Sequence, residues 1–158
     1  MIWDPSYLSL FLLPIGALGV SVGLISLSWY DVTRFEIDPP SLLLVVLGAA
    51  ATFLALGQDF TAPLSAGVVL LTLSLGLRIC SPKSIGEGDL WLFAGLGFVS
   101  GPLVGVFVST LFVACLITAF AYSRARGKPA LKSSFPMALP ACIAASIAFA
   151  IQLLGVVV

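Results

Sequence analysis

The sequence predicts an all-α polytopic membrane protein: one domain over residues 1–158, folded as a bundle of six transmembrane helices with both termini outside. Two features of the composition indicate this class, since 60% of the 158 residues are hydrophobic and only 9% are charged. The mean hydropathy is +1.19, and a chain with so few polar groups cannot cover the surface of a soluble globule. A third observation is that long apolar runs alternate with short polar turns. We therefore expect the lipid bilayer to surround most of this chain.

The apolar runs are the expected membrane spans, because a spanning helix needs about 20 mostly apolar residues. The first run has Gly16, Gly19 and Gly23 on one side at helical spacing, so a second helix could approach its backbone closely. The fourth run is short and can span only if neighbouring helices shield its ends. The six expected spans cover residues 7–29, 41–56, 64–77, 89–99, 103–122 and 136–154.

The basic residues indicate how the spans are oriented. Six alternating spans put the turns at residues 31–40, 78–88 and 123–133 on one side of the membrane. By the positive-inside rule, that side faces the cytoplasm, and both termini then face outward. The opposite side keeps only Asp4 and Asp59. The basic residues in the three turns are Arg34, then Arg78 and Lys83, then Arg124, Arg126, Lys128 and Lys132, which are all seven in the chain.

Charge and cysteine content exclude several classes of function. The formal net charge is zero, and no basic tract is dense enough to bind phosphate backbones, so we expect no nucleic acid partner. The chain has no histidine, and its cysteines, Cys80, Cys115 and Cys142, are single and widely spaced. The usual zinc and haem ligand sets are therefore missing, and we expect no metal and no cofactor.

The turn before the fourth span has the features of a site. Residues 83–90, Lys-Ser-Ile-Gly-Glu-Gly-Asp-Leu, are charged and rich in glycine and run directly into an apolar segment. Asp89 would start a membrane helix at the water boundary or just inside it. Gly86 and Gly88 carry no side chains, so a loop, a second acid or an extended peptide could approach closely. The simpler interpretation is a turn followed by an acid that caps the next helix, where the helix dipole favours it.

A second acid occupies a matching position. Asp31 closes the first expected span and Asp89 opens the fourth, so both carboxylates would lie at cytoplasmic helix ends at similar depth. Ionisable groups at membrane depth are costly and mark pathways or reaction centres. Two carboxylates that meet share one proton and can divide the work of base and acid, as in an aspartic protease. The alternative is that both acids mark helix ends in water, like Glu36, Asp38 and Glu87.

These residues resemble the two motifs of the type IV prepilin peptidases, which are membrane aspartic proteases with a GxGD motif. The first motif is Tyr30-Asp31, followed by a short basic turn to Ile37 and a proline. The second is Gly-Glu-Gly-Asp-Leu at residues 86–90, with Leu92 and the Gly-Leu-Gly of residues 95–97 downstream. Residues 135–141, Phe-Pro-Met-Ala-Leu-Pro-Ala, are similar to the start of that family's last helix. Two positions depart from the pattern, because Trp91 stands where the family usually has lysine and Asp38 separates Ile37 from the prolines.

The resemblance implies that Asp31 and Asp89 are the catalytic pair, in an aspartic endopeptidase that needs no cofactor. Gly86 and Gly88 would shape the approach of an extended substrate. The substrates would be prepilins or pseudopilins with a short basic leader, cleaved at the cytoplasmic face of a bacterial or archaeal cytoplasmic (inner) membrane. Long members of the family also carry a domain with paired CxxC motifs, so this chain resembles the short members that act only as peptidases.

Three alternatives stay open. The first is a small proton-coupled transporter that uses the same two acids as a proton relay. The second is a catalytically silent relative that only acts as a scaffold in pilus assembly. The third is a presenilin-like protease with other substrates, which fits the Tyr-Asp and proline-rich segments less well. A cleavage assay separates the leader peptidase from these alternatives.

Overall fold

The computed structural model describes residues 5–80, 86–126 and 136–155, and the regular structure in these ranges is entirely helical. This confirms the predicted all-α class. In order along the chain, the elements are α1 (Pro5–Arg34), α2 (Pro39–Ala55), α3 (Thr61–Cys80), α4 (Glu87–Ser100), the 3₁₀ turn η1 (Gly101–Leu103), α5 (Val104–Arg126) and α6 (Ala138–Leu153).

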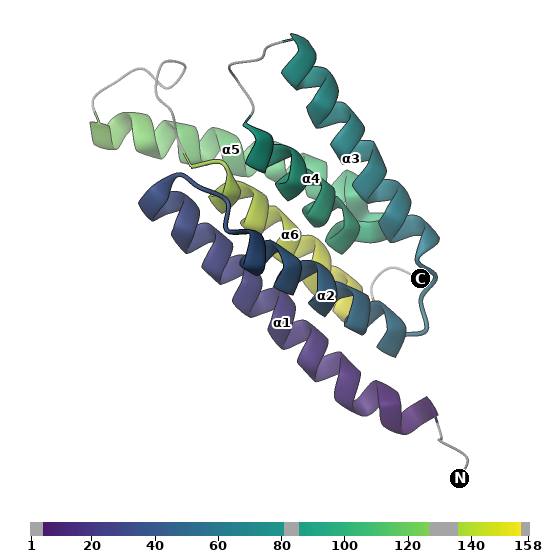
Figure 1. The fold of residues 1–158 in the computed structure, drawn as a ribbon. Coiled ribbons are helices and arrows are strands. Elements are labelled where there is room, and N and C mark those ends of the chain that lie inside the picture. The colour runs from purple at the N-terminus through teal and green to yellow at the C-terminus, as the bar shows by residue number, and fades with distance from the viewer. Residues whose placement is uncertain (1–4, 81–85, 127–135, 156–158) are drawn as a thin grey trace.

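Successive helices run in alternating directions (Figure 1). The last residues of α1, α3 and α5 and the first residues of α2, α4 and α6 lie toward the same end of the bundle. We call this the Asp31 end, after the acid in the last turn of α1. The arrangement is the one that alternating membrane spans require. Six crossings and the outward position of both termini stay predictions.

Length and hydropathy also fit a membrane protein. Within the described residues, three helical stretches are long and apolar enough to cross a bilayer, namely Ser9–Arg34, Thr61–Cys80 and Glu87–Ala125. The helices Pro39–Ala55 and Ala138–Leu153 are apolar but shorter. Many large apolar side chains point outward, among them Leu18, Ile25 and Phe120 at 67%, 70% and 69% exposure. Apolar surface of this extent is suited to lipid and not to water.

Glycines let α1 and α2 pack with their backbones almost in contact. A Cβ atom added at Gly16 would lie 2.6 Å from the carbonyl oxygen of Gly48, and one added at Gly23 would lie 2.9 Å from that of Ser41. Any side chain at these positions would force the two helices apart. The predicted close approach along the Gly16, Gly19 and Gly23 side of the first span is therefore confirmed.

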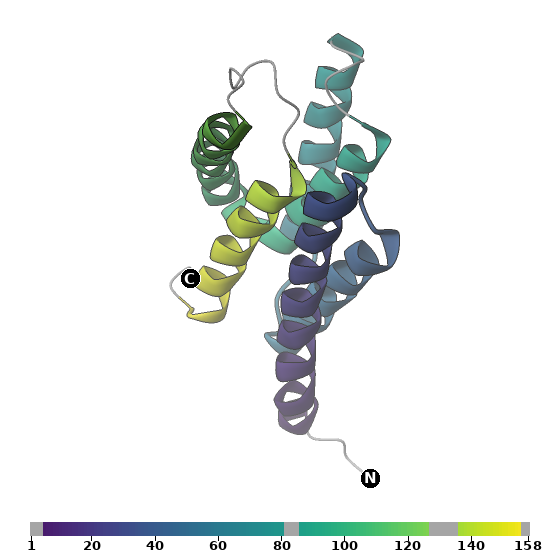
Figure 2. The same cartoon turned by 90° about the vertical axis from the view of Figure 1, so that its left-hand side faces the viewer.

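Helix α4 is the centre of the bundle and packs against α2, α3 and α6. With 14 residues it is about 21 Å long, which is less than the roughly 30 Å of the hydrocarbon layer. Its neighbours bury Leu92 and Leu96 completely. Figure 2 shows α6 between α5 and α1, and α6 contacts both of them. Neighbouring helices thus shield the middle of α4 and its C-terminal end, where Val99 and Ser100 are buried, while Glu87 and Trp91 near its start are exposed.

Several helix ends differ from the expected spans. The first expected span stops at residue 29, with a turn from Asp31 onward, but α1 continues to Arg34. Residues 29–35 contain no proline or glycine, and Phe35 ends the helix in a left-handed conformation with φ of 56°. Asp31 therefore projects from the last turn of a helix and not from a loop. The basic segment 123–133 is likewise helical up to Arg126, while its remainder lies outside the described residues.

Candidate active site

Asp31 is a buried acid that joins α1 to α6. Its side chain is only 6% exposed. Its Oδ2 atom accepts hydrogen bonds from the backbone N–H groups of Ala138, at 2.5 Å, and Leu139, at 3.3 Å. These are the first two residues of α6, where free N–H groups and the helix dipole favour an anion. The alternative that Asp31 marks a helix end in open water is therefore wrong.

Asp89 belongs to the first turn of α4 and is half-buried. Its Oδ2 atom accepts a hydrogen bond of 2.9 Å from the backbone N–H of Gly86. The carboxylate therefore caps its own helix, as the simpler interpretation of this turn expects. Capping uses one of the two carboxylate oxygens. The other remains to accept a hydrogen bond from a water molecule or a substrate.

The two acids come from distant parts of the chain. The charge of Asp89 is the weakest of the influences on Asp31, after burial and the hydrogen bonds from Ala138 and Leu139. Helix α6 contacts both α1, which carries Asp31, and α4, which carries Asp89. Two acids that repel each other when both are charged can hold one shared proton. The structure thus places the two predicted catalytic residues on helices that share α6 as a neighbour, while their pairing and their catalytic role stay predictions.

The two glycines of the turn have different surroundings. Gly86 is exposed, and a Cβ atom there would meet only Asp89 Oδ2 at 3.4 Å, which is an ordinary contact. Gly88 is half-buried, and a Cβ atom there would lie 2.9 Å from Cγ1 and 3.2 Å from Cβ of Ile37. The group that approaches Gly88 in this structure is therefore Ile37 of the turn after α1. A role of either glycine in binding substrate stays a prediction.

Of the other acids in the adjoining turns, Glu87 and Asp38 have structural partners. Glu87 is an exposed residue in the first turn of α4, and not in a loop as expected, and it forms a 3.0 Å ion pair with Arg78 at the end of α3. Asp38 caps α2 by accepting a hydrogen bond of 3.0 Å from the N–H of Ser41. Glu36 is exposed. Among the described residues, no cluster of three or more His, Cys, Asp or Glu side chains is arranged to hold a metal ion.

Two apolar grooves open on the sides of the bundle near these acids. One, of about 710 Å³, lies between α2, α3 and α4 and reaches Ile37, Gly88 and Trp91. The other, of about 600 Å³, lies between α1 and α6 and has Val32 and Leu139 beside Asp31 at one end. Sequence reasoning missed both grooves, because each is formed by the packing of separate helices, which the pattern of a single helix does not encode.

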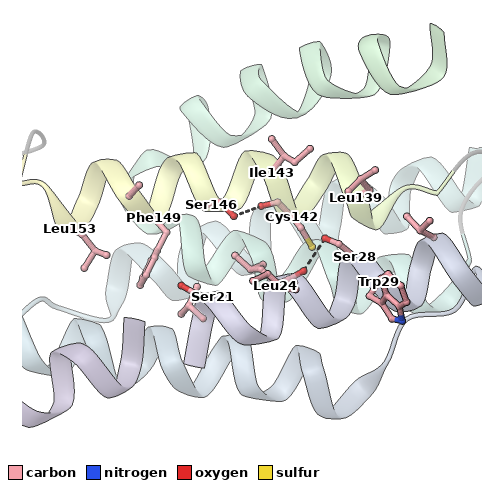
Figure 3. A pocket seen from close by; sticks show the side chains of 14 residues that line it. Ser21, Leu24, Ser28, Trp29, Leu139, Cys142, Ile143, Ser146, Phe149 and Leu153 are labelled. Carbon is pink, nitrogen blue, oxygen red and sulfur yellow. Dashed lines mark hydrogen bonds between the residues drawn. The ribbon is translucent and has the colours of Figure 1, made fainter. Parts of the chain in front are cut away.

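The groove between α1 and α6 is apolar in spite of its serines (Figure 3). The hydroxyl of Ser28 donates to the carbonyl oxygen of Leu24 at 2.9 Å, and the hydroxyl of Ser146 donates to that of Cys142 at 2.8 Å. Each hydroxyl is thus satisfied by its own helix. Such a surface makes contact with apolar groups without leaving a polar group unpaired.

Outward-facing apolar side chains on several long helices indicate a multi-pass membrane protein. The chain belongs to the type IV leader peptidase family, whose model matches residues 7–124. Searches of the curated proteins and of the solved structures found no match. The family is one of peptidases, and the matched range contains both Asp31 and Asp89. It ends before α6, so the similarity of residues 135–141 to the family's last helix stays a prediction.

Proposed function

We propose that this protein is a membrane-embedded aspartic endopeptidase. It removes the short basic leader from type IV prepilins or pseudopilins at the cytoplasmic face of a bacterial or archaeal membrane. The observation that supports this most is the burial of Asp31, which is 6% exposed and accepts hydrogen bonds from the first turn of α6. Both acids lie within the range that matches the leader peptidase family. An acid buried in a membrane protein is costly to keep and indicates a functional site.

The pair would act by sharing one proton. One carboxylate takes a proton from a water molecule, while the other, protonated acid gives its proton to the oxygen of the scissile carbonyl. The water oxygen bonds to the carbonyl carbon and forms a gem-diol. The two acids then exchange roles: the C–N bond breaks, the leaving amine receives a proton, and one diol hydroxyl loses its proton. Because the titrations of the two groups are coupled, neither acid is assigned a single microscopic role.

The hydrogen bonds suggest which oxygens act. Backbone N–H groups hold Oδ2 of Asp31 and Oδ2 of Asp89. We therefore assign the chemistry to Oδ1 of each acid. In this arrangement the backbone orients each carboxylate before substrate arrives, which lowers the reorganisation needed in the transition state.

The test is a cleavage assay with the purified protein in liposomes. The substrate is a prepilin with a basic leader, and the product is identified by sequencing its new N-terminus. We expect a single product that begins directly after the leader. A transporter or a silent scaffold would leave the prepilin intact, and a protease with other substrates would cut elsewhere or not at all. Either result would contradict the proposal.

A further inference from the structure

The contact between Ile37 and Gly88 joins the two segments that carry the acids. Ile37 lies six residues after Asp31, and Gly88 directly precedes Asp89. A Cβ atom at Gly88 would lie 2.9 Å from Ile37 Cγ1, closer than real Cβ atoms approach their neighbours. The obstructing atoms belong to the branched base of the isoleucine and not to a flexible tip. Any side chain at residue 88 must therefore displace Ile37 or α4.

Ile37 cannot move aside easily, because the turn that carries it is held on both sides. Before it, Phe35 ends α1 with φ of 56°, and its N–H donates to the carbonyl of Asp31 at 3.0 Å. After it, Asp38 accepts hydrogen bonds from the N–H and the hydroxyl of Ser41. The side chain of Ile37 also packs against the hydrophobic core. Displacing Ile37 would therefore shift the end of α1.

Gly88 and Asp89 are held together on the other side of the contact. The hydrogen bond from Gly86 N–H to Asp89 Oδ2 fixes the carboxylate to the first turn of α4, which includes Gly88. A shift of Gly88 therefore carries Asp89 with it. The position of Asp31 depends on the end of α1 and that of Asp89 on the start of α4. The Ile37–Gly88 contact connects the turn that follows the end of α1 to the start of α4.

We infer that Ile37, seated on Gly88, is the positioning residue that sets the separation between the Asp31 and Asp89 carboxyl groups. The missing side chain at Gly88 then makes room for Ile37 and not for an approaching substrate. The effect on cleavage rests on the proposed function, whereas the effect on the geometry does not. Ile37 acts only through the position of the two acids and touches neither of them in the reaction.

Suppression between the two positions tests this role. Gly88→Ala should lower the cleavage rate by about 100-fold, since a displacement of about 1 Å at an active site has effects of this size. Adding Ile37→Ala removes the 2.9 Å contact and leaves only the 3.2 Å contact between Cβ atoms, which a small shift relieves. The double variant should regain most of the lost rate. If it stays as slow as Gly88→Ala, the inference is wrong.

Two control variants separate this effect from general ones. Gly76→Ala adds a methyl group to α3 at a position where the new Cβ atom would have no neighbour within 4 Å outside the backbone of its own helix. This variant should leave cleavage unchanged. Leu42→Ala removes an apolar side chain from the groove between α2, α3 and α4, which Ile37 and Gly88 also line. Leu42 lies against Gly95 and not against Gly88. The Leu42→Ala change should not rescue Gly88→Ala. Rescue by Leu42→Ala would mean that loosening the groove is sufficient, and the specific role of Ile37 would be refuted.

A distance measurement tests the geometry without any cleavage. Spin labels at Thr33→Cys on α1 and Glu87→Cys on α4, both exposed, report the distance between the two helix ends. The native cysteines are replaced by alanine in this background. We expect one narrow distance in the parent, a changed or broader distribution in Gly88→Ala, and the parent distribution again in the double variant. An unchanged distance in an inactive Gly88→Ala variant would show that Gly88 acts on substrate and would overturn the inference.

A further variant covers the case in which Gly88→Ala does not accumulate. Ile37→Ala alone leaves Gly88 without its partner, so the label distribution should broaden and cleavage should fall several-fold. An Ile37→Ala variant with the parent distribution would refute the positioning role. If the distances respond as expected while the parent protein cleaves no prepilin, the proposed function fails and the positioning role stands.

Discussion

Asp31 combines a structural role and a proposed chemical role in one side chain. Its Oδ2 atom caps α6 through Ala138 and Leu139, so the same residue holds α1 against α6 and presents its other oxygen to the site. The sequence predicts an acid at the end of the first span. The sequence does not predict the capping partner, because Ala138 is 107 residues away. Nothing in the residues at the start of α6 indicates which acid caps that helix.

Asp38 has a testable structural role at the start of α2. It caps that helix through Ser41, whose hydroxyl oxygen lies 2.8 Å from that of Ser26 on α1. Asp38→Ala should lower the free energy of unfolding by about 1 kcal/mol, since it removes the cap. Asp38→Asn should be nearly neutral, because an asparagine oxygen accepts the same bond. Thermal unfolding in detergent measures both, and equal stability of the two variants would contradict the capping role.

At the scale of helices, the closest packing in the bundle is the α1–α2 hairpin. Its geometry depends on where the glycines lie, and the predicted glycine side of the first span is the side that packs. What the sequence leaves open is which glycines are needed. Only the structure distinguishes the two positions: a Cβ atom added at Gly16 would lie less than 3 Å from backbone atoms of α2, whereas one added at Gly19 would lie 3.4 Å from Gly48 Cα.

This difference leads to a prediction with a matched control. Gly16→Ala should destabilise the protein by about 1–3 kcal/mol, because overpacking forces the helix backbones apart. Gly19→Ala should cost much less, since its new methyl group makes an ordinary contact. The two changes are chemically identical and one helical turn apart. Unfolding in detergent gives both values, and a Gly19→Ala variant at least as unstable as Gly16→Ala would contradict this packing.

At the scale of the whole molecule, composition and the spacing of apolar runs were sufficient to predict an all-helical membrane protein with a short fourth helix. The structure corrects the helix ends, which extend beyond the apolar runs because a polar residue does not by itself end a helix: α1 continues through Asp31, which caps α6, to Arg34. The grooves and the Ile37–Gly88 contact could not be predicted. They depend on how separate helices pack against each other, which the pattern of a single helix does not encode.

The orientation in the membrane is testable with a native residue. Cys80 is exposed at the end of α3. In a background with Cys115 and Cys142 replaced by alanine, Cys80 and an introduced Arg124→Cys should react with a membrane-impermeant thiol reagent from the cytoplasmic side. Asp59→Cys, tested without Cys80, should react only from the opposite side. Reaction of Cys80 and residue 124 from opposite sides would contradict the six-span arrangement.

The central claim is that Asp31 and Asp89 act as one unit. Asp31→Asn keeps an oxygen that can accept the hydrogen bonds of α6, so the variant should insert and accumulate normally, and Asp89→Asn keeps the bond to Gly86 in the same way. The matched control is Glu36→Gln, at an exposed acid of the adjoining turn, which should retain most activity.

The most direct measurement is prepilin cleavage by the two single variants and the double variant at equal protein level. Each single change should abolish nearly all cleavage, because one carboxyl cannot share a proton with an amide. The double variant should be hardly slower than either, since groups that act together are not additive when removed. Near-normal cleavage by Asp31→Asn would contradict the claim that the acids act as a pair. A loss of rate in the double variant equal to the product of the two single losses would contradict it as well.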